Sequence, residues 1–168
     1  MKLSSIAFSL LLLGAMAVAA SPDNNQVDAQ TAFARLKTLA GNWQAKTPKG
    51  TAQVRYELIA GGSVLLEHES MPGHDEMLTT YHLDGDKLVL THYCTAGNQP
   101  HMVAERFDPQ SGELDFAFAG GTNLSAGPGH MRSLRLQLVS GNRVDAAWNF
   151  LKNDNTTLSE DFHYTRVK

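Results

Sequence analysis

The sequence contains a single cysteine, Cys94, among its 168 residues. One cysteine cannot form an intramolecular disulfide, so the fold has to be stabilised by packing rather than by covalent cross-links. The thiol is either a buried and inert side chain or a group that is present for its chemistry, and the sequence leaves both open.

Clusters of basic residues are also missing. Lys and Arg together number 14 against 17 Asp and Glu, which gives a formal net charge of -3 at pH 7. Nucleic acids and anionic membrane surfaces bind proteins through concentrated Lys and Arg side chains. The charge pattern therefore argues against both as partners.

Long apolar runs are missing except at the N-terminus, where residues 6–20 are almost entirely apolar and follow the single positive charge of Lys2. A charged start, a short apolar stretch and small residues at its end are typical of a secretory signal peptide. The run is shorter than the roughly 20 residues of a transmembrane helix. We therefore predict a signal peptide over residues 1–20 and a mature domain over residues 21–168. We expect that domain to be exported, to the bacterial periplasm or the medium, without stable membrane insertion.

Helical periodicity is confined to residues 27–40, and the rest of the chain reads as short strands separated by turn residues. The predicted strands are 42–47, 51–59, 63–70, 76–83, 87–94, 101–107, 113–118, 130–139, 143–150 and 158–167. This pattern predicts an all-β fold, an antiparallel up-and-down barrel of about ten strands with a short N-terminal helix plugging one end.

The connections alternate in length. Tight turn sequences such as 84–86 and 140–142 alternate with longer loops such as 95–100 and 119–129. In an up-and-down meander every second connection lies at the same end, so we expect the longer loops to surround an open mouth. The glycine-rich loop 120–129 is expected to act there as a flexible lid.

The alternation within the strands predicts an inner surface with an apolar floor and polar side chains above it. A carboxylate or an imidazole inside a core needs a polar partner, so inward polar groups favour a ligand pocket over a purely structural interior. The side chains expected to hold the polar end of a ligand are Tyr81, Glu105, His92 and His68, and those expected to hold its apolar part are Leu66, Leu90, Phe116 and Trp148.

The residues 41–43, Gly-Asn-Trp, follow the helix at the start of the first strand, and Arg166 lies two residues from the end of the chain. This combination resembles the G-x-W and terminal Arg of lipocalins and related calycin barrels. The resemblance implies that Gly41 and Trp43 lie at the closed end, that Trp43 packs against Arg166, and that small, largely apolar molecules bind inside. The stretch 79–102 is also similar to a group of exported bacterial proteins, a similarity that implies no activity.

Two other functions fit the sequence. Met77, His92, Cys94 and His101 fall at strand ends that face the predicted mouth, and thioether, thiolate and imidazole ligands together suit copper or zinc. A barrel with a filled interior, acting as a structural or partner-binding protein, is the further alternative. A small-molecule ligand remains the favoured interpretation.

No cofactor is assigned by the sequence. Nitrobindin-like barrels share the ten-strand calycin architecture and hold haem through a histidine near the C-terminus, which by position implies His163. The alternation of strand 158–167, however, places His163 on the face opposite Phe162 and Tyr164. The chain also contains no G-x-S-x-G elbow and no recognisable nucleophile–base pair, so the sequence does not predict an enzyme.

Overall fold

The computed structural model describes residues 27–168, so the predicted signal peptide and the first residues of the predicted mature domain lie outside the described residues. The helix α1 spans Ala29–Lys37, and a 3-10 turn, η1, spans Ala60–Gly62. The strands are β1 (Gly41–Thr47), β2 (Gly50–Ile59), β3 (Val64–Ser70), β4 (Met77–Asp84), β5 (Lys87–Tyr93), β6 (Gln99–Asp108), β7 (Glu113–Thr122), β8 (Gly129–Ser140), β9 (Arg143–Lys152) and β10 (Thr157–Arg166).

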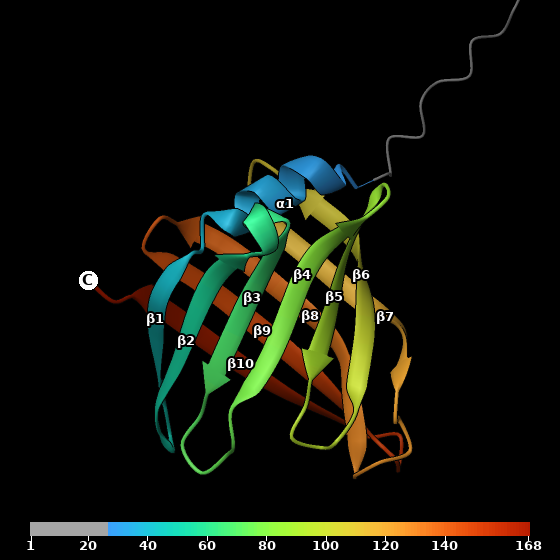
Figure 1. The fold of residues 1–168 in the computed structure, drawn as a ribbon. Coiled ribbons are helices and arrows are strands. Elements are labelled where there is room, and N and C mark those ends of the chain that lie inside the picture. Colours follow the sequence, from blue (N-terminus) through green and yellow to red (C-terminus); the bar gives the residue numbers. More distant parts are fainter. Residues whose placement is uncertain (1–26) are drawn as a thin grey trace, which may run out of the picture.

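The ten strands form one closed antiparallel barrel (Figure 1). Each strand pairs with its neighbours in the chain, and β1 pairs with β10 through Trp43 opposite Arg166 and Gln44 opposite Thr165. Closure leaves the sheet without an open edge across the described residues, which removes a site of strand-to-strand aggregation. The predicted all-β fold, strand number and antiparallel order are thus confirmed.

The helix α1 covers one end of the barrel (Figure 1). Asp28 begins it by accepting a hydrogen bond from the backbone N–H of Thr31 at 3.0 Å. One face of the helix buries apolar side chains, including Phe33 and Leu36, and α1 contacts β4 and β5. The helix that was predicted to plug one end is therefore amphipathic, and its apolar face packs on the barrel core.

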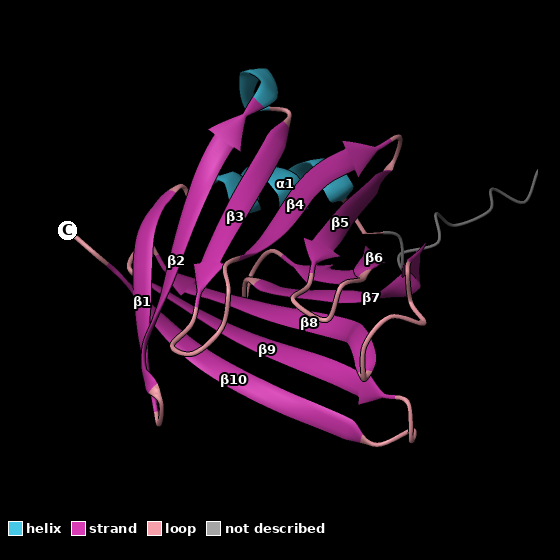
Figure 2. Ribbon diagram, turned by 60° about the horizontal axis from the view of Figure 1, so that its bottom comes forward, coloured by secondary structure: helices cyan, strands magenta, loops and turns pink. Residues whose placement is uncertain are grey.

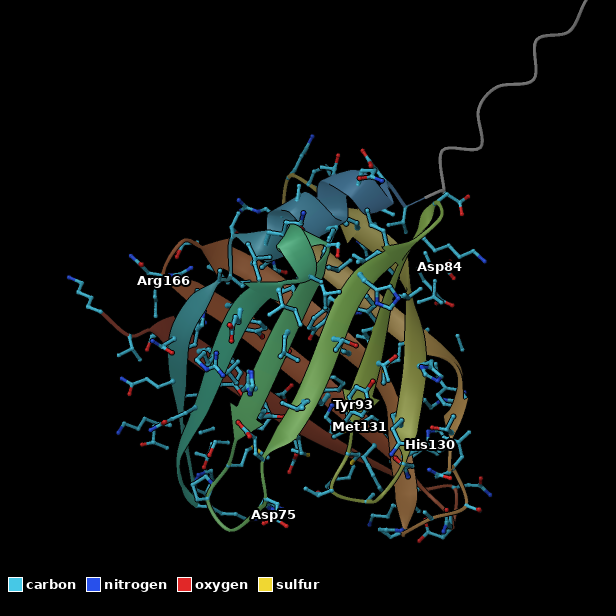
Figure 3. The ribbon with its side chains drawn as sticks, in the orientation of Figure 1. Asp75, Asp84, Tyr93, His130, Met131 and Arg166 are labelled. Atoms are coloured by element: carbon cyan, nitrogen blue, oxygen red, sulfur yellow. The ribbon has the colours of Figure 1, made fainter. Side chains whose placement is uncertain are left out.

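The opposite end of the barrel is here called the loop end (Figure 2). Five of the nine connections between strands lie there. They are 48–49, 71–76, 94–98, 123–128 and 153–156. Figure 2 turns this end toward the viewer, and Figure 3 shows Asp75 there while Arg166 lies at the helix end. The four turns at the helix end are tight, as the alternation of loop lengths indicated.

Arg166 and Trp43 form the contact that the calycin resemblance implied. The guanidinium carbon of Arg166 lies 4.2 Å from the centre of the Trp43 ring, and its nitrogens donate to the carbonyl oxygens of Ala40 and Thr38 at 2.7 and 2.8 Å. Gly41 has φ +129°, and a Cβ there would stand 2.7 Å from Nη1 of Arg166. The glycine is needed both for the backbone conformation and for the approach of the arginine.

β3 lies one residue out of the predicted phase. Leu66 and His68 were expected inside the barrel, but Leu65, Glu67 and Glu69 are the buried residues of this strand. The strand opens with three consecutive apolar residues, so alternation alone did not define which face is internal. The pairing with β4 determines the observed phase and turns His68 to the outer surface.

β6 contains a second departure. Glu105 was expected inside but is exposed on the outer face, while Met102 and Ala104 are buried. The register shifts just after Ala104, which leaves Glu105 as an extra residue opposite β7. Such a β-bulge reverses the inward and outward phase of a strand. Beyond it Phe107 packs against the core, as predicted.

Candidate functional site

The inner face of β2, β3, β4 and β10 carries a group of acidic and phenolic side chains, here called the acid–tyrosine cluster. Its members are Glu67, Glu69, Tyr56, Tyr81 and Tyr164. The two glutamates are only 3% and 4% exposed. The Tyr81 hydroxyl donates to Oε2 of Glu67 at 2.5 Å, and the Tyr164 hydroxyl donates to Oε1 of Glu69 at 3.4 Å. Tyr56 also hydrogen-bonds to Glu67.

The two carboxyl groups are strongly perturbed by their environment. Burial raises the pKa of Glu67 from 4.5 to about 7, against the lowering effect of the hydrogen bonds from Tyr81 and Tyr56. Burial, followed by the charges of Glu67 and Glu160, raises the pKa of Glu69 to about 8. Within residues 27–168 no Lys or Arg forms an ion pair with either group. The interior therefore holds two acids without a balancing cation.

His92 lies next to this cluster on β5. Its side chain is completely buried, Nδ1 lies 2.9 Å from Oγ1 of Thr79, and its ring centre lies 5.1 Å from that of Trp148. Burial lowers the pKa of His92 to about 4, so the imidazole is neutral at pH 7. Its Nε2 atom is buried without a hydrogen-bond partner among the described residues.

Thr79 connects the histidine to the acids. It stands opposite Glu67 of β3 on one side and opposite His92 of β5 on the other. Three neighbouring strands thus present a row of carboxyl, hydroxyl and imidazole groups to the interior. An unpartnered buried nitrogen in such a row costs free energy unless another molecule supplies its hydrogen bond.

Apolar walls face these polar groups. Leu90, Phe116, Trp148 and Tyr81 are buried on the inner side of the barrel, where the sequence placed them. The rings of Tyr81 and Phe116 lie 5.8 Å apart at an angle of 59°. Their role in binding a ligand stays a prediction. Of the remaining expected contacts, Leu66, His68 and Glu105 do not lie on the inner face of the barrel, for the reasons given above.

A cavity of about 300 Å³ opens at the loop end. It is lined by Met71, His74, Glu160 and Phe162, together with the β1–β2 turn. Phe162 stacks on Tyr164 with ring centres 5.5 Å apart, and Tyr164 reaches Glu69 through its hydroxyl. The cavity thus lies beside the acid–tyrosine cluster.

The four proposed metal ligands do not converge. Met77 and His92 are buried inside the barrel, and Cys94 is half-buried at the end of β5, where burial raises the pKa of its thiol. His101 lies on the outer face, with Nδ1 2.8 Å from Oγ1 of Thr91, because β5 and β6 pair these two residues. In the described part of the chain no group of three or more His, Cys, Asp or Glu is arranged to hold a metal ion.

His163 faces away from the interior, as the alternation of β10 indicated. Its side chain is 69% exposed, and Nδ1 lies 3.0 Å from Oδ1 of Asp145 on the outer surface. The residue that the nitrobindin resemblance implies as a haem ligand therefore does not fit that group inside the barrel.

Hydrogen bonds from neighbouring loops hold the glycine-rich loop that was expected to act as a flexible lid. The fully buried Asn98 donates from Nδ2 to the carbonyl oxygens of Ala126 and Gly129, at 3.3 and 2.7 Å. Asn153 donates to the carbonyl oxygen of Gly127 at 3.1 Å. The loop could only swing outward by breaking these bonds. Asn98, at the end of the loop 94–98, is the residue that sequence reasoning missed here.

Comparison with known proteins adds the fold and nothing more specific. No family model matches the sequence, and neither does any curated protein. Among solved structures, the crystal structure of Rv2717c from M. tuberculosis superposes with a TM-score of 0.53 at 13% sequence identity, covering 82% of this chain and 98% of that chain. At this identity the likeness shows a shared barrel fold.

None of the helices in residues 27–168 has the length and hydropathy needed to cross a membrane.

Proposed function

We propose that the protein binds a small, partly apolar molecule inside the barrel. The observation that carries the proposal is the buried pair Glu67 and Glu69 beside the unpartnered Nε2 of His92. The apolar walls formed by Leu90, Phe116 and Trp148 are suited to the rest of the ligand, and the cavity at the loop end provides an approach.

The energetic cost of these groups supports a ligand role. A carboxyl group whose pKa rises on burial destabilises the fold once it ionises, and apolar residues of similar volume would fill the same space without that cost. A barrel selected only for stability has no use for Glu67, Glu69 and His92 at these positions. A pocket that has to recognise polar atoms does.

The contact between Trp43 and Arg166, with Gly41 beneath the guanidinium, supports a relation to the calycin barrels. This is an analogy of fold and of a short motif, and it supports a binding protein because calycins as a group hold small molecules in the barrel. Together with the apolar run at the N-terminus, this analogy also supports an exported protein that binds its ligand outside the cytoplasm.

Native mass spectrometry combined with elemental analysis tests the proposal. The protein is purified from cells without denaturation, in the original form and as Glu67→Gln, with the outer-face variant Glu105→Gln as the matched control. We expect an organic molecule bound to the original protein and to Glu105→Gln, and lower occupancy in Glu67→Gln.

Other outcomes would contradict it. Stoichiometric copper or zinc, lost in Cys94→Ser, would favour the soft-metal alternative. If the native mass spectra of all three preparations show only the mass of the protein, and added small molecules do not bind, a filled structural or partner-binding barrel would be favoured.

A further inference from the structure

Within residues 27–168, the side chains that face the acid–tyrosine cluster are acids, phenols, an imidazole and a thiol, with no Lys or Arg among them. The titratable groups that face the acid–tyrosine cluster from the surrounding strands are Tyr56 of β2, Glu67 and Glu69 of β3, Tyr81 of β4, His92 of β5, Cys94 after β5, and Glu160 and Tyr164 of β10. None of these side chains carries a positive charge at neutral pH.

Two lysines and a histidine of the described residues, Lys46, Lys49 and His74, border the cavity at the loop end. Lys46 is exposed and directs Nζ to Oγ1 of Thr51 at 3.2 Å. Neither Lys46 nor Lys49 forms an ion pair with the buried acids.

The hydrogen bonds inside the cluster leave acceptor positions open. An ionised carboxylate has about four lone-pair positions. Glu69 receives one hydroxyl, from Tyr164, and Glu160 lies close enough for its charge to raise the pKa of Glu69. Glu160 also lines the cavity at the loop end, on β10, a strand that is not a neighbour of β3 in the barrel.

We propose that the ligand is an organic cation, a primary or secondary amine or a guanidine on an apolar body, whose charged group binds between Glu69, Glu67 and Glu160. This inference rests on the proposed function and specifies its ligand class. A cationic group supplies the several donors and the positive charge that these carboxylates lack.

Two further features fit a donor-rich ligand on this acidic face of the barrel. The buried Nε2 of His92 is unpartnered, and in the tautomer whose Nδ1–H donates to Thr79 it presents a lone pair to an incoming N–H. Phe162 borders the cavity at the loop end and stacks on Tyr164, whose hydroxyl donates to Glu69, and aromatic faces attract ammonium and guanidinium groups. An anion would instead meet three acidic side chains.

Binding of a cation has a consequence that a neutral ligand would not have. The cation favours the ionised form of the carboxyl groups, so a protein whose acids are partly protonated releases protons as it binds. An aliphatic amine stays protonated up to about pH 10, as lysine does. The affinity for an amine should therefore rise between about pH 6 and about pH 8. Each carboxyl group that loses its proton on binding contributes a rise of up to roughly tenfold per pH unit.

Isothermal titration calorimetry with matched probes tests the inference. Three apolar bodies, octyl, 2-phenylethyl and 2-(indol-3-yl)ethyl, are each presented with an ammonium, a hydroxyl or a carboxylate end. Proton release is measured by repeating each titration in buffers of different ionisation enthalpy. The full chain is compared with Glu69→Gln and with the control Glu105→Gln, whose carboxylate is on the outer face.

For at least one body we expect the ammonium probe to bind about 10 to 100 times more tightly than its hydroxyl and carboxylate partners, with net proton release. Glu69→Gln should remove most of this preference and the proton release while the hydroxyl probe keeps its affinity, and Glu105→Gln should change neither. The retained hydroxyl affinity also shows that Glu69→Gln is folded.

The remaining outcomes overturn the inference in distinguishable ways. Equal or tighter binding of the hydroxyl or carboxylate probes would refute the cation while leaving a ligand-binding barrel in place. An ammonium preference that persists unchanged in Glu69→Gln would assign it to the rim and also refute the inference. Absence of binding for all nine probes at millimolar concentration would count against both the cation and the proposed function.

Discussion

Raising the pH from about 5 to about 9 is expected to weaken this fold, because Glu67 and Glu69 are buried without a basic partner. Their pKa values in the folded protein, about 7 and about 8, lie above the 4.5 of an exposed glutamate. A group whose pKa is raised by folding stabilises the fold fully below its unfolded pKa. That stabilisation is lost as the pH rises through the folded pKa. The affected range is therefore about pH 4.5 to about pH 8.

The magnitude follows from the size of the shifts. One pKa unit corresponds to about 1.4 kcal/mol, so the shift of Glu69 from 4.5 to about 8 amounts to about 5 kcal/mol. The shift of Glu67 amounts to about 3 kcal/mol on the same basis. The two groups interact, so these values do not add, and we expect a total loss of about 5 kcal/mol. That is a large share of the about 5 to 15 kcal/mol by which domains are stable.

His92 acts in the opposite direction at lower pH. Its pKa falls from 6.5 to about 4 on burial, so its contribution is lost as the pH decreases from about 6.5 to about 4. Above about pH 6.5 the histidine no longer affects the slope. The decline between about pH 6.5 and about pH 8 is therefore the cleanest measure of the two acids.

Urea unfolding followed by tryptophan fluorescence, at a series of pH values, gives the free energy of unfolding. Glu69→Gln should flatten the decline and stabilise the protein above about pH 8, whereas the surface control Glu105→Gln should keep the original slope. The reasoning is refuted if the original protein is equally stable from about pH 5 to about pH 9, or if Glu69→Gln declines as steeply as the original.

Three further predictions concern other parts of the barrel. Arg166→Met should lower the free energy of unfolding by about 2 to 4 kcal/mol through loss of its carbonyl and ring contacts, measured by urea unfolding against the exposed control Arg132→Met. The double variant Thr79→Val/His92→Leu should change the free energy of unfolding at pH 7 by less than about 1 kcal/mol, because both partners of one hydrogen bond are replaced together. The same variant should lower ligand occupancy in native mass spectra. A large loss of stability would show that the pair is structural. Cys94 should react with a disulfide reagent at about pH 8 more slowly than an exposed thiol does, because burial raises its pKa, and a rate equal to that of free cysteine would contradict the assigned environment.

The fold was predictable because its determinants are local. Tight turns such as Asp84-Gly85-Asp86, the single helical segment and the strand alternation each depend on a few neighbouring residues, and the closing contact of Trp43 with Arg166 was carried by a short motif. Inner positions such as Leu90, Phe116 and Trp148 followed from strands with clear alternation.

The polar part of the site was only partly predictable. In β3 both faces carry polar residues after an apolar start, so choosing His68 over Glu67 and Glu69 depended on a phase that only the pairing with β4 defines. In β6 the bulge at Glu105 has no clear local signal, since no glycine or proline marks it. Tyr81 and His92 were placed correctly because the tight turn between their strands fixes the register.

The seam between β1 and β10 also bears on how the protein reaches its native state. The first and last strands meet there, Trp43 lies under Arg166, and the N–H of Val167 donates to the carbonyl oxygen of Asn42 at 2.8 Å. Contacts between residues separated by most of the chain form late and slow folding, because a long loop has to close first. The barrel stays open until β10 is available to pair with β1, and sealing of this seam buries Trp43, so that tryptophan fluorescence would report the closure.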